Sequence, residues 1–231
     1  IMKNIFIACD TTNIQQIKKI INKSKIKLKG YKIGFKFGLE FFYSKNGRKF
    51  ILNLKEKNLW LDIKIFDIPN TSYSAIKSIK DLKNISYITV HVSGGLEMLK
   101  AVKKAVKKYN KKLKILGVTV LTSFSNSSIK KIGHIKSIKS LVLKQSKLAK
   151  EAKLDGIVCS AKDIKFIKRI CKNMEIVTPG IRLQGDNLHD QKRVMSPKEA
   201  FKSGATSIVM GRSLIKGNFK NNIQKLIKSL N

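Results

Sequence analysis

Three charged residues lie close together in segment 61–71, LDIKIFDIPNT, which is otherwise mostly apolar. Asp62 and Lys64 are two residues apart, so in an extended strand their side chains point to the same side. Asp67 follows past the expected end of that strand. Because the chain has 49 basic and only 14 acidic residues, two acids this close to one lysine are unusual. A buried structural ion pair is the alternative interpretation, but buried charges are costly and favour a functional site.

Eight short segments rich in Val and Ile predict strands, and most are followed by a segment with helical spacing. The expected strands are 3–9, 31–35, 59–66, 86–92, 114–121, 156–159, 175–177 and 207–210. Continuous apolar strands alternating with helices are typical of a parallel sheet buried on both faces. A doubly wound open sheet is the alternative, but the first turn, CDTTN, lacks the Gly-rich sequence typical of that fold. We therefore expect an α/β fold, a (β/α)8 TIM barrel.

The length of 231 residues suits one barrel domain, which we expect over residues 2–231, with Ile1 an added residue ahead of Met2. No apolar run approaches the roughly 18–20 residues of a membrane span, and no signal peptide opens the chain. Three cysteines, odd in number and widely spaced, predict reduced thiols in the cytoplasm: Cys9, Cys159 and Cys171. No spacing of histidines and acids suggests a metal site.

The formal net charge of +35 raises the alternative of a nucleic-acid-binding protein. Only five of the basic residues are Arg, whereas base readout and bidentate phosphate contacts favour Arg. The lysines are spread along every expected helix, and Ile and Asn are abundant too, as in an AT-rich coding sequence. We expect salt-sensitive, non-specific binding to polyanions at most, and no specific nucleic-acid partner.

Polar residues follow the ends of several expected strands, and in a barrel these ends converge on one mouth. Five charged residues alternate in sign there and predict one array: Asp10, Lys32, Asp62, Lys64 and Asp67. At about 4 Å and an effective dielectric near 20, each opposite pair is worth roughly 4 kcal/mol, and each like pair costs as much. Interleaved signs therefore allow several charges to share one pocket beside a ligand.

The loops after the seventh and eighth expected strands predict a phosphate site. They contain VTPGIR at 177–182 and MGRS at 210–213. Gly180 and Gly211 allow close approach of the backbone, while Arg182 and Arg212 supply two of the five guanidinium groups. These two loops commonly bind phosphate in barrels of this kind.

LDIKIFDIPNT closely resembles the DxKxxDIPNT signature of the orotidine 5′-phosphate decarboxylase family, in its bacterial type. The resemblance extends along the chain through IACD, YKIG, VHVSGG, GVTVLTS, DGIVCSA, VTPGIRLQGDNLHDQKR and MGRS. The DxKxxD core alone is shared with related sugar-phosphate decarboxylases and aldolases, which usually require Mg²⁺ and lack IPNT. These enzymes are the alternative within the same barrel group. Family-typical residues are replaced at Cys9 (commonly Leu), Phe66 (commonly His) and Leu183 (usually Pro).

The resemblance implies loss of CO2 from orotidine 5′-monophosphate to give UMP, the last step of pyrimidine nucleotide synthesis, without metal or cofactor. It makes Lys64 the proton donor to C6 of the pyrimidine. Asp62 would press on the substrate carboxylate and then stabilise the cation beside the carbanion. Lys32 and Asp10 would hold the ribose hydroxyls and orient the array.

The resemblance also implies a homodimer with shared active sites. In such enzymes the residues that correspond to Asp67 and Thr71 reach the neighbouring subunit's site. Thr122 would face the pyrimidine. The resemblance places four residues around the phosphate, the second of them on a closing loop: Arg182, Gln191, Gly211 and Arg212. The family has a counterpart of His91, and we interpret His91 as a structural residue.

Overall fold

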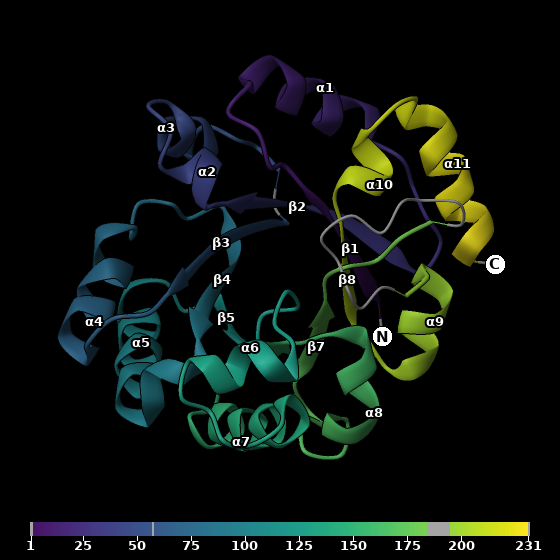
Figure 1. Cartoon of the computed structure of the whole chain (residues 1–231). Helices are drawn as coiled ribbons and strands as arrows, with labels where there is room; N and C mark the ends of the chain where they lie inside the picture. Colours follow the sequence, from purple (N-terminus) through teal and green to yellow (C-terminus); the bar gives the residue numbers. More distant parts are fainter. Residues whose placement is uncertain (1, 57, 184–194, 231) are drawn as a thin grey trace.

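The computed structural model describes residues 2–56, 58–183 and 195–230. Eight parallel strands pair in sequence order and close into a barrel, because β1 pairs with both β2 and β8 (Figure 1). The strands are β1 (Lys3–Ala8), β2 (Tyr31–Gly38), β3 (Leu59–Ile65), β4 (Ile85–His91), β5 (Lys114–Val118), β6 (Gly156–Val158), β7 (Glu175–Thr178) and β8 (Ser207–Met210). The predicted TIM barrel is confirmed.

Helices surround the barrel and cover the outer faces of its strands (Figure 1). They are α1 (Ile14–Lys23), α2 (Leu39–Phe42), α3 (Gly47–Leu52), α4 (Pro69–Ser78), α5 (Gly95–Tyr109), α6 (Asn126–Lys131), α7 (Ile138–Glu151), α8 (Ile164–Ile167), α9 (Pro197–Ser203), α10 (Arg212–Ile215) and α11 (Phe219–Leu230), with the 3-10 turns η1 (Val92–Gly94) and η2 (Ala161–Asp163). No helix in these described ranges is long and apolar enough to cross a membrane.

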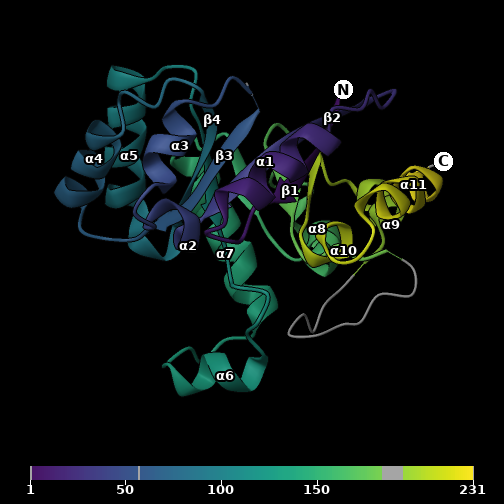
Figure 2. The same cartoon turned by 90° about the horizontal axis from the view of Figure 1, so that it is seen from above.

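Helix α1 illustrates how the sequence produces this outer layer. Asn13 caps its N-terminus, since the side-chain oxygen accepts a hydrogen bond from the backbone N–H of Gln16 at 3.0 Å. Ile17, Ile20 and Ile21 are buried at helical spacing, so one face packs on the barrel. Helix α6 differs, because it stands apart from the barrel body (Figure 2).

Two hydrophobic cores follow from the alternation of side chains along the strands. One fills the barrel interior, where Phe6 packs edge-on against Trp60 and Tyr87 with ring centroids 5.2 and 5.3 Å away. The other lies between the strands and the helices. The interior core consists of Phe6, Ala8, Trp60, Tyr87, Leu116, Val118, Val158, Val177 and Val209.

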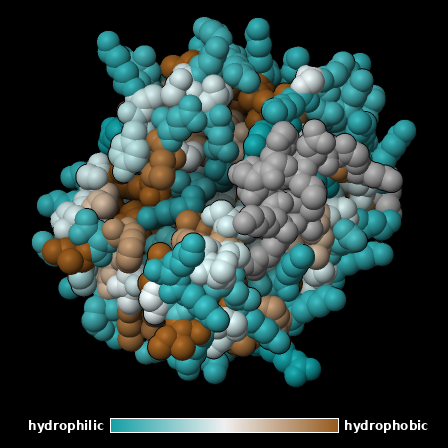
Figure 3. Space-filling model, viewed as in Figure 1, coloured by the Kyte–Doolittle hydropathy of each residue, from teal (hydrophilic) through white to brown (hydrophobic). Residues whose placement is uncertain are grey.

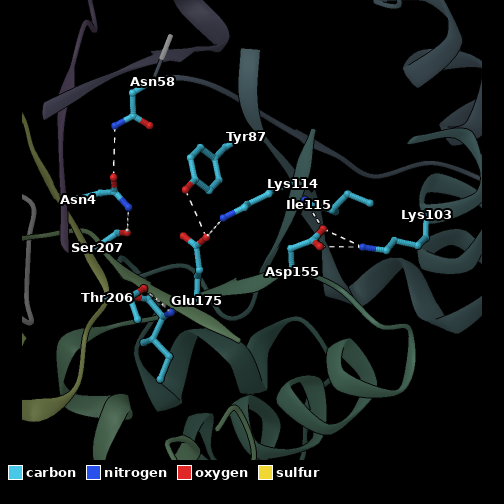
Figure 4. A network of polar contacts seen from close by, with 11 residues as sticks. Asn4, Asn58, Tyr87, Lys103, Lys114, Ile115, Asp155, Glu175, Thr206 and Ser207 are labelled. Atoms are coloured by element: carbon cyan, nitrogen blue, oxygen red, sulfur yellow. Dashed lines mark hydrogen bonds and ion pairs between the residues drawn. The ribbon is translucent and has the colours of Figure 1, made fainter. Parts of the chain in front are cut away.

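A polar layer closes the barrel at the N-terminal ends of its strands (Figure 4). Asn4 donates to Ser207 Oγ at 3.3 Å and accepts from Asn58 Nδ2 at 3.3 Å. Beside it, the Glu175 carboxylate accepts from Tyr87 Oη at 3.3 Å and from Lys114. In barrels of this class this end contributes to stability, whereas chemistry occurs at the opposite end.

The observed elements differ from the expected ones chiefly around β2, β5 and β6, and β5, expected over 114–121, ends at Val118. Strand β2 continues to Gly38 instead of stopping at residue 35, and two short helices, α2 and α3, follow it. The Ser- and Asn-rich segment after β5 contains α6, whose start is fixed by a capping box between Ser125 and Ser128. Strand β6 is followed by the short η2 and α8.

Candidate active site

A cavity of about 260 Å³ opens at the C-terminal ends of the strands. Interior residues of β1, β5, β6 and β8 form its apolar floor, and charged residues and loop glycines form its walls. The lining residues are Ala8, Asp10, Lys36, Trp60, Asp62, Lys64, Val118, Val120, Leu121, Thr122, Val158, Cys159, Pro179, Gly180, Arg182, Val209, Gly211 and Arg212.

Four charged side chains form a row of alternating sign in this cavity. Lys36 Nζ lies 3.1 Å from Asp10 Oδ1 and 3.3 Å from Asp62 Oδ2. Lys64 Nζ lies 3.0 Å from Asp62 Oδ1. The order Asp10, Lys36, Asp62, Lys64 therefore separates like charges and places each ammonium beside a carboxylate.

The prediction that Lys32 belongs to this row is wrong, because Lys36 occupies the place between the two acids. Lys32 is exposed and pairs in register with Asn4. Asn4 belongs to the polar layer at the opposite end of the barrel (Figure 4). The two lysines are four residue steps apart along the strand, a distance of about 13 Å. The expected strand ended at residue 35, so Lys36 was placed beyond it.

The row perturbs the pKa values of its two most buried members. Burial by itself would lower the pKa of Lys36, but the carboxylates of Asp62 and Asp10 outweigh it and raise that pKa above the ordinary value. Burial would raise the pKa of Asp62, but Lys36, Lys64 and a hydrogen bond from Thr89 lower that pKa. Lys36 is therefore a cation and Asp62 an anion at neutral pH.

Strand β3 is distorted where it carries Asp62 and Lys64. The register with β4 shifts between Leu61 and Ile65, and Lys64 has φ 47°, in the left-handed region. Thr89 lies opposite this irregularity and contacts both charged residues. Thr89 is a site residue that the sequence did not predict. The only signal was a threonine within the apolar segment ISYITVH, at the same strand parity as Tyr87.

The residues predicted to bind phosphate and pyrimidine also line the cavity: Thr122, Gly180, Arg182, Gly211 and Arg212. Gly180 has φ 76°, a backbone conformation that favours glycine. The backbone N–H of Arg182 donates to Met195 O at 3.1 Å, and its Nη1 donates to Ile181 O at 3.1 Å. Two guanidinium groups therefore share one cavity with the row of charges.

Asp67 and Thr71 do not belong to the cavity of their own chain, and both are exposed. Asp67 Oδ1 accepts from the backbone N–H of Ile68 at 2.7 Å, and its backbone oxygen accepts from Ser72 Oγ at 3.1 Å. The predicted row of five charges is thus a row of four on this chain. Gln191 lies outside the described residues.

His91 lies at the end of β4, and its ring centroid is 5.6 Å from that of Phe66. Burial and the nearby charge of Lys64 lower its pKa, so the imidazole is neutral at neutral pH. Burial also raises the pKa of Cys9 to about 12, which makes this thiol a poor nucleophile. Within the described parts of the chain, no group of three His, Cys, Asp or Glu could hold a metal ion.

The sequence has relatives along nearly its whole length. The orotidine 5′-phosphate decarboxylase from Buchnera aphidicola subsp. Acyrthosiphon pisum is 40% identical over 235 residues, covering 99% of this chain and 96% of the relative. The enzyme of that name from the Wolbachia of Brugia malayi is 40% identical, covering 99% of this chain and 100% of the relative. Both alignments therefore include every lining residue of the cavity.

Solved structures agree with the sequence relatives. Orotidine 5′-phosphate decarboxylase from Lactobacillus acidophilus superposes with a TM-score of 0.82 at 30% identity, covering 99% of each chain. The Methanocaldococcus jannaschii enzyme, complexed with inhibitor BMP, superposes with a TM-score of 0.77 at 25% identity, covering 100% of each chain. The model of the orotidine 5′-phosphate decarboxylase / HUMPS family matches residues 3–223. With its barrel, its row of four charges and this match over almost its whole length, the chain belongs to the orotidine 5′-phosphate decarboxylase / HUMPS family.

Proposed function

We propose that this chain is a carbon–carbon lyase that converts orotidine 5′-monophosphate to UMP and CO2, in pyrimidine synthesis. The observation that carries the proposal is the row of alternating charges, which shares a cavity with Arg182 and Arg212. The segment DIPNT, which follows the row in sequence, distinguishes it from the sugar-phosphate enzymes of the same barrel group. The names of its relatives agree with this assignment.

The row fits the charge changes of this reaction. Loss of CO2 leaves an electron pair at C6 of the pyrimidine, with no adjacent carbonyl to accept the charge. The ammonium of Lys64 stabilises this carbanion and gives C6 its proton. Asp62 lies beside the leaving carboxylate and, once CO2 has gone, beside the cation that remains. Lys36 takes the role that was expected of Lys32, since it holds Asp62 and Asp10 in place.

The phosphate of the substrate is an anion and therefore needs positively charged groups around it. Arg182 and Arg212 bind it as cations, while Gly180 and Gly211 let the backbone approach, and Thr122 faces the pyrimidine. Gln191 joins the phosphate site in this proposal. Binding energy from the phosphate, distant from C6, can then support the chemical step. The reaction needs no metal or cofactor in this scheme.

We also propose a homodimer in which Asp67 and Thr71 enter the partner's site. Phe66 and Ile68, on either side of Asp67, are 63% and 66% exposed. Large apolar side chains exposed together are typical of protein interfaces. A cytoplasmic location belongs to the same proposal, because Cys9, Cys159 and Cys171 are free thiols.

The test follows the fall in absorbance of orotidine 5′-monophosphate with the wild type and with Lys64→Ala. We expect wild-type turnover that EDTA does not reduce, and a kcat at least about 100-fold lower in Lys64→Ala, because the proton donor is gone. Lys153→Ala is the matched control, since Lys153 also has a positive φ, 55°, but lies exposed outside the cavity. Unchanged turnover in Lys64→Ala would refute the mechanism, and activity restored only by Mg²⁺ after EDTA would favour a sugar-phosphate enzyme.

A further inference from the structure

We propose that Thr89 is a positioning residue that holds Asp62 and Lys64 in their reactive arrangement, an inference that rests on the proposed function. Thr89 lies in β4, is 0% exposed and does not line the cavity. Its role would be exerted through the two charged residues and not by contact with the substrate.

The pairing of β3 with β4 leaves Thr89 alone opposite three residues. Leu61 pairs with Ile88, and Ile65 pairs with Val90. One residue of β4 therefore faces residues 62–64 of β3, where a regular parallel ladder would match residues one to one. Backbone groups of this excess segment that face β4 lose their ladder partners there and need others.

The hydroxyl of Thr89 supplies one such partner, and it uses both of its hydrogen-bonding functions. As an acceptor, Thr89 Oγ1 receives the backbone N–H of Lys64 at 3.0 Å. As a donor, it gives its proton to Asp62 Oδ1 at 2.8 Å. The same Oδ1 lies 3.0 Å from Lys64 Nζ. One buried hydroxyl thus joins the backbone of the proton donor to the carboxylate that its ammonium contacts.

This connection matters because the backbone of Lys64 is in a conformation that a lysine rarely adopts. Its φ of 47° persists only if the surroundings hold it. Without the hydroxyl, the N–H of Lys64 would lose its partner in a half-buried position, and rotation toward an ordinary conformation would relieve the strain. Rotation would move Nζ away from Asp62, and therefore away from C6 of the substrate.

The expected effect is on kcat and not on KM, because the two arginines that bind phosphate are untouched. Thr89→Val keeps the shape and removes the hydroxyl, and we expect kcat to fall at least tenfold with KM changed less than threefold. Thr119→Val is the matched control. Thr119 is also 0% exposed, but its hydroxyl donates to the backbone oxygen of Val158 at 2.9 Å. A kcat loss equal in the two variants would overturn the proposal.

A second pair of variants protects the test against poor folding of Thr89→Val. Thr89→Ser and Thr89→Ala both lose the methyl group, and only the serine keeps the hydroxyl. We expect Thr89→Ser to retain kcat within about threefold of the wild type and Thr89→Ala to resemble Thr89→Val. Equal kcat values for the serine and alanine variants would contradict the assignment.

Amide hydrogen exchange separates this inference from the proposed function. The N–H of Lys64 should exchange slowly in the wild type and at least tenfold faster in Thr89→Val, while Thr119→Val leaves it unchanged. If the wild type does not turn over orotidine 5′-monophosphate, the proposed function fails, yet the exchange rates still test whether Thr89 holds Lys64. Unchanged exchange at Lys64 in Thr89→Val would refute the positioning role.

Discussion

Lys36 contacts both acids of the row, so its removal should affect chemistry and stability together. In Lys36→Met we expect kcat/KM to fall at least about 100-fold, because Asp62 and Asp10 lose the cation that orients them. Lys32→Met is the matched control, since Lys32 is exposed and pairs in register with Asn4. Steady-state kinetics of the two variants checks this, and a larger loss in Lys32→Met would contradict the assignment.

The stability effect of Lys36→Met should depend on pH in a defined way. Leaving buried Asp62 without this cation should lower the free energy of unfolding by up to about 3 kcal/mol. The lowered pKa of Asp62 means that its contribution is complete above its ordinary value of 3.8 and is lost as pH falls through the folded value. The raised pKa of Lys36 means that its contribution is complete below 10.5 and is lost at higher pH. Urea unfolding should therefore show a constant difference in the free energy of unfolding between the wild type and Lys36→Met from pH 5 to 9. This difference should shrink in strong acid.

Sequence alone could not choose between the two lysines. Lys32 and Lys36 both stand in a K-x-G tripeptide, YKIG and FKFG, and both have the parity that points into the barrel. Only the position of the strand end separates them, and strand ends are the least reliable part of such a prediction. Asp10, Asp62 and Lys64 could be predicted because charges are rare in apolar strands.

At the scale of elements, the loop after β7 depends on the left-handed backbone of Gly180. A Cβ there is strained, so Gly180→Ala should lower the free energy of unfolding by about 1 kcal/mol. It should also raise KM several-fold with less effect on kcat, because the loop lines the cavity with Arg182. Gly217→Ala is the matched control, since Gly217 has φ 71° and open space around a Cβ, but lies between α10 and α11. Thermal melts and KM values decide this, and an equal rise in KM for both variants would contradict the loop's role.

The eight strands could be predicted as elements because most are short apolar segments rich in Val or Ile. The distortion of β3 could not, since it arises from pairing with β4 and leaves no mark in the spacing of Asp62 and Lys64. Helix α6 was missed for a related reason. Its six residues, NSSIKK, contain one apolar side chain, so no periodicity can appear, and the serine cap alone marks its start.

For the whole molecule, the +35 charge resides in side chains that cover the surface, which is largely hydrophilic around the rim of the barrel (Figure 3). A surface of this kind keeps copies of the chain apart through repulsion. Association must therefore depend on apolar contact, which the exposed side chains of Phe66 and Ile68 can supply. Asp67 lies between them, so an interface at this point would bring an acid toward the partner.

Mixing two inactive variants tests the proposed shared site. Asp62→Ala and Asp67→Ala are each expected to be inactive, but in a mixed dimer one site receives intact Asp62 from one subunit and intact Asp67 from the other. With random exchange, half of the dimers are mixed and each has one intact site, so about a quarter of wild-type activity should return. The control mixture is Asp62→Ala with Lys64→Ala. These residues form an ion pair of 3.0 Å within one chain, so no mixed dimer has an intact site. Recovery in the control, or none in the first mixture despite proven subunit exchange, would exclude a site completed by Asp67 of the partner.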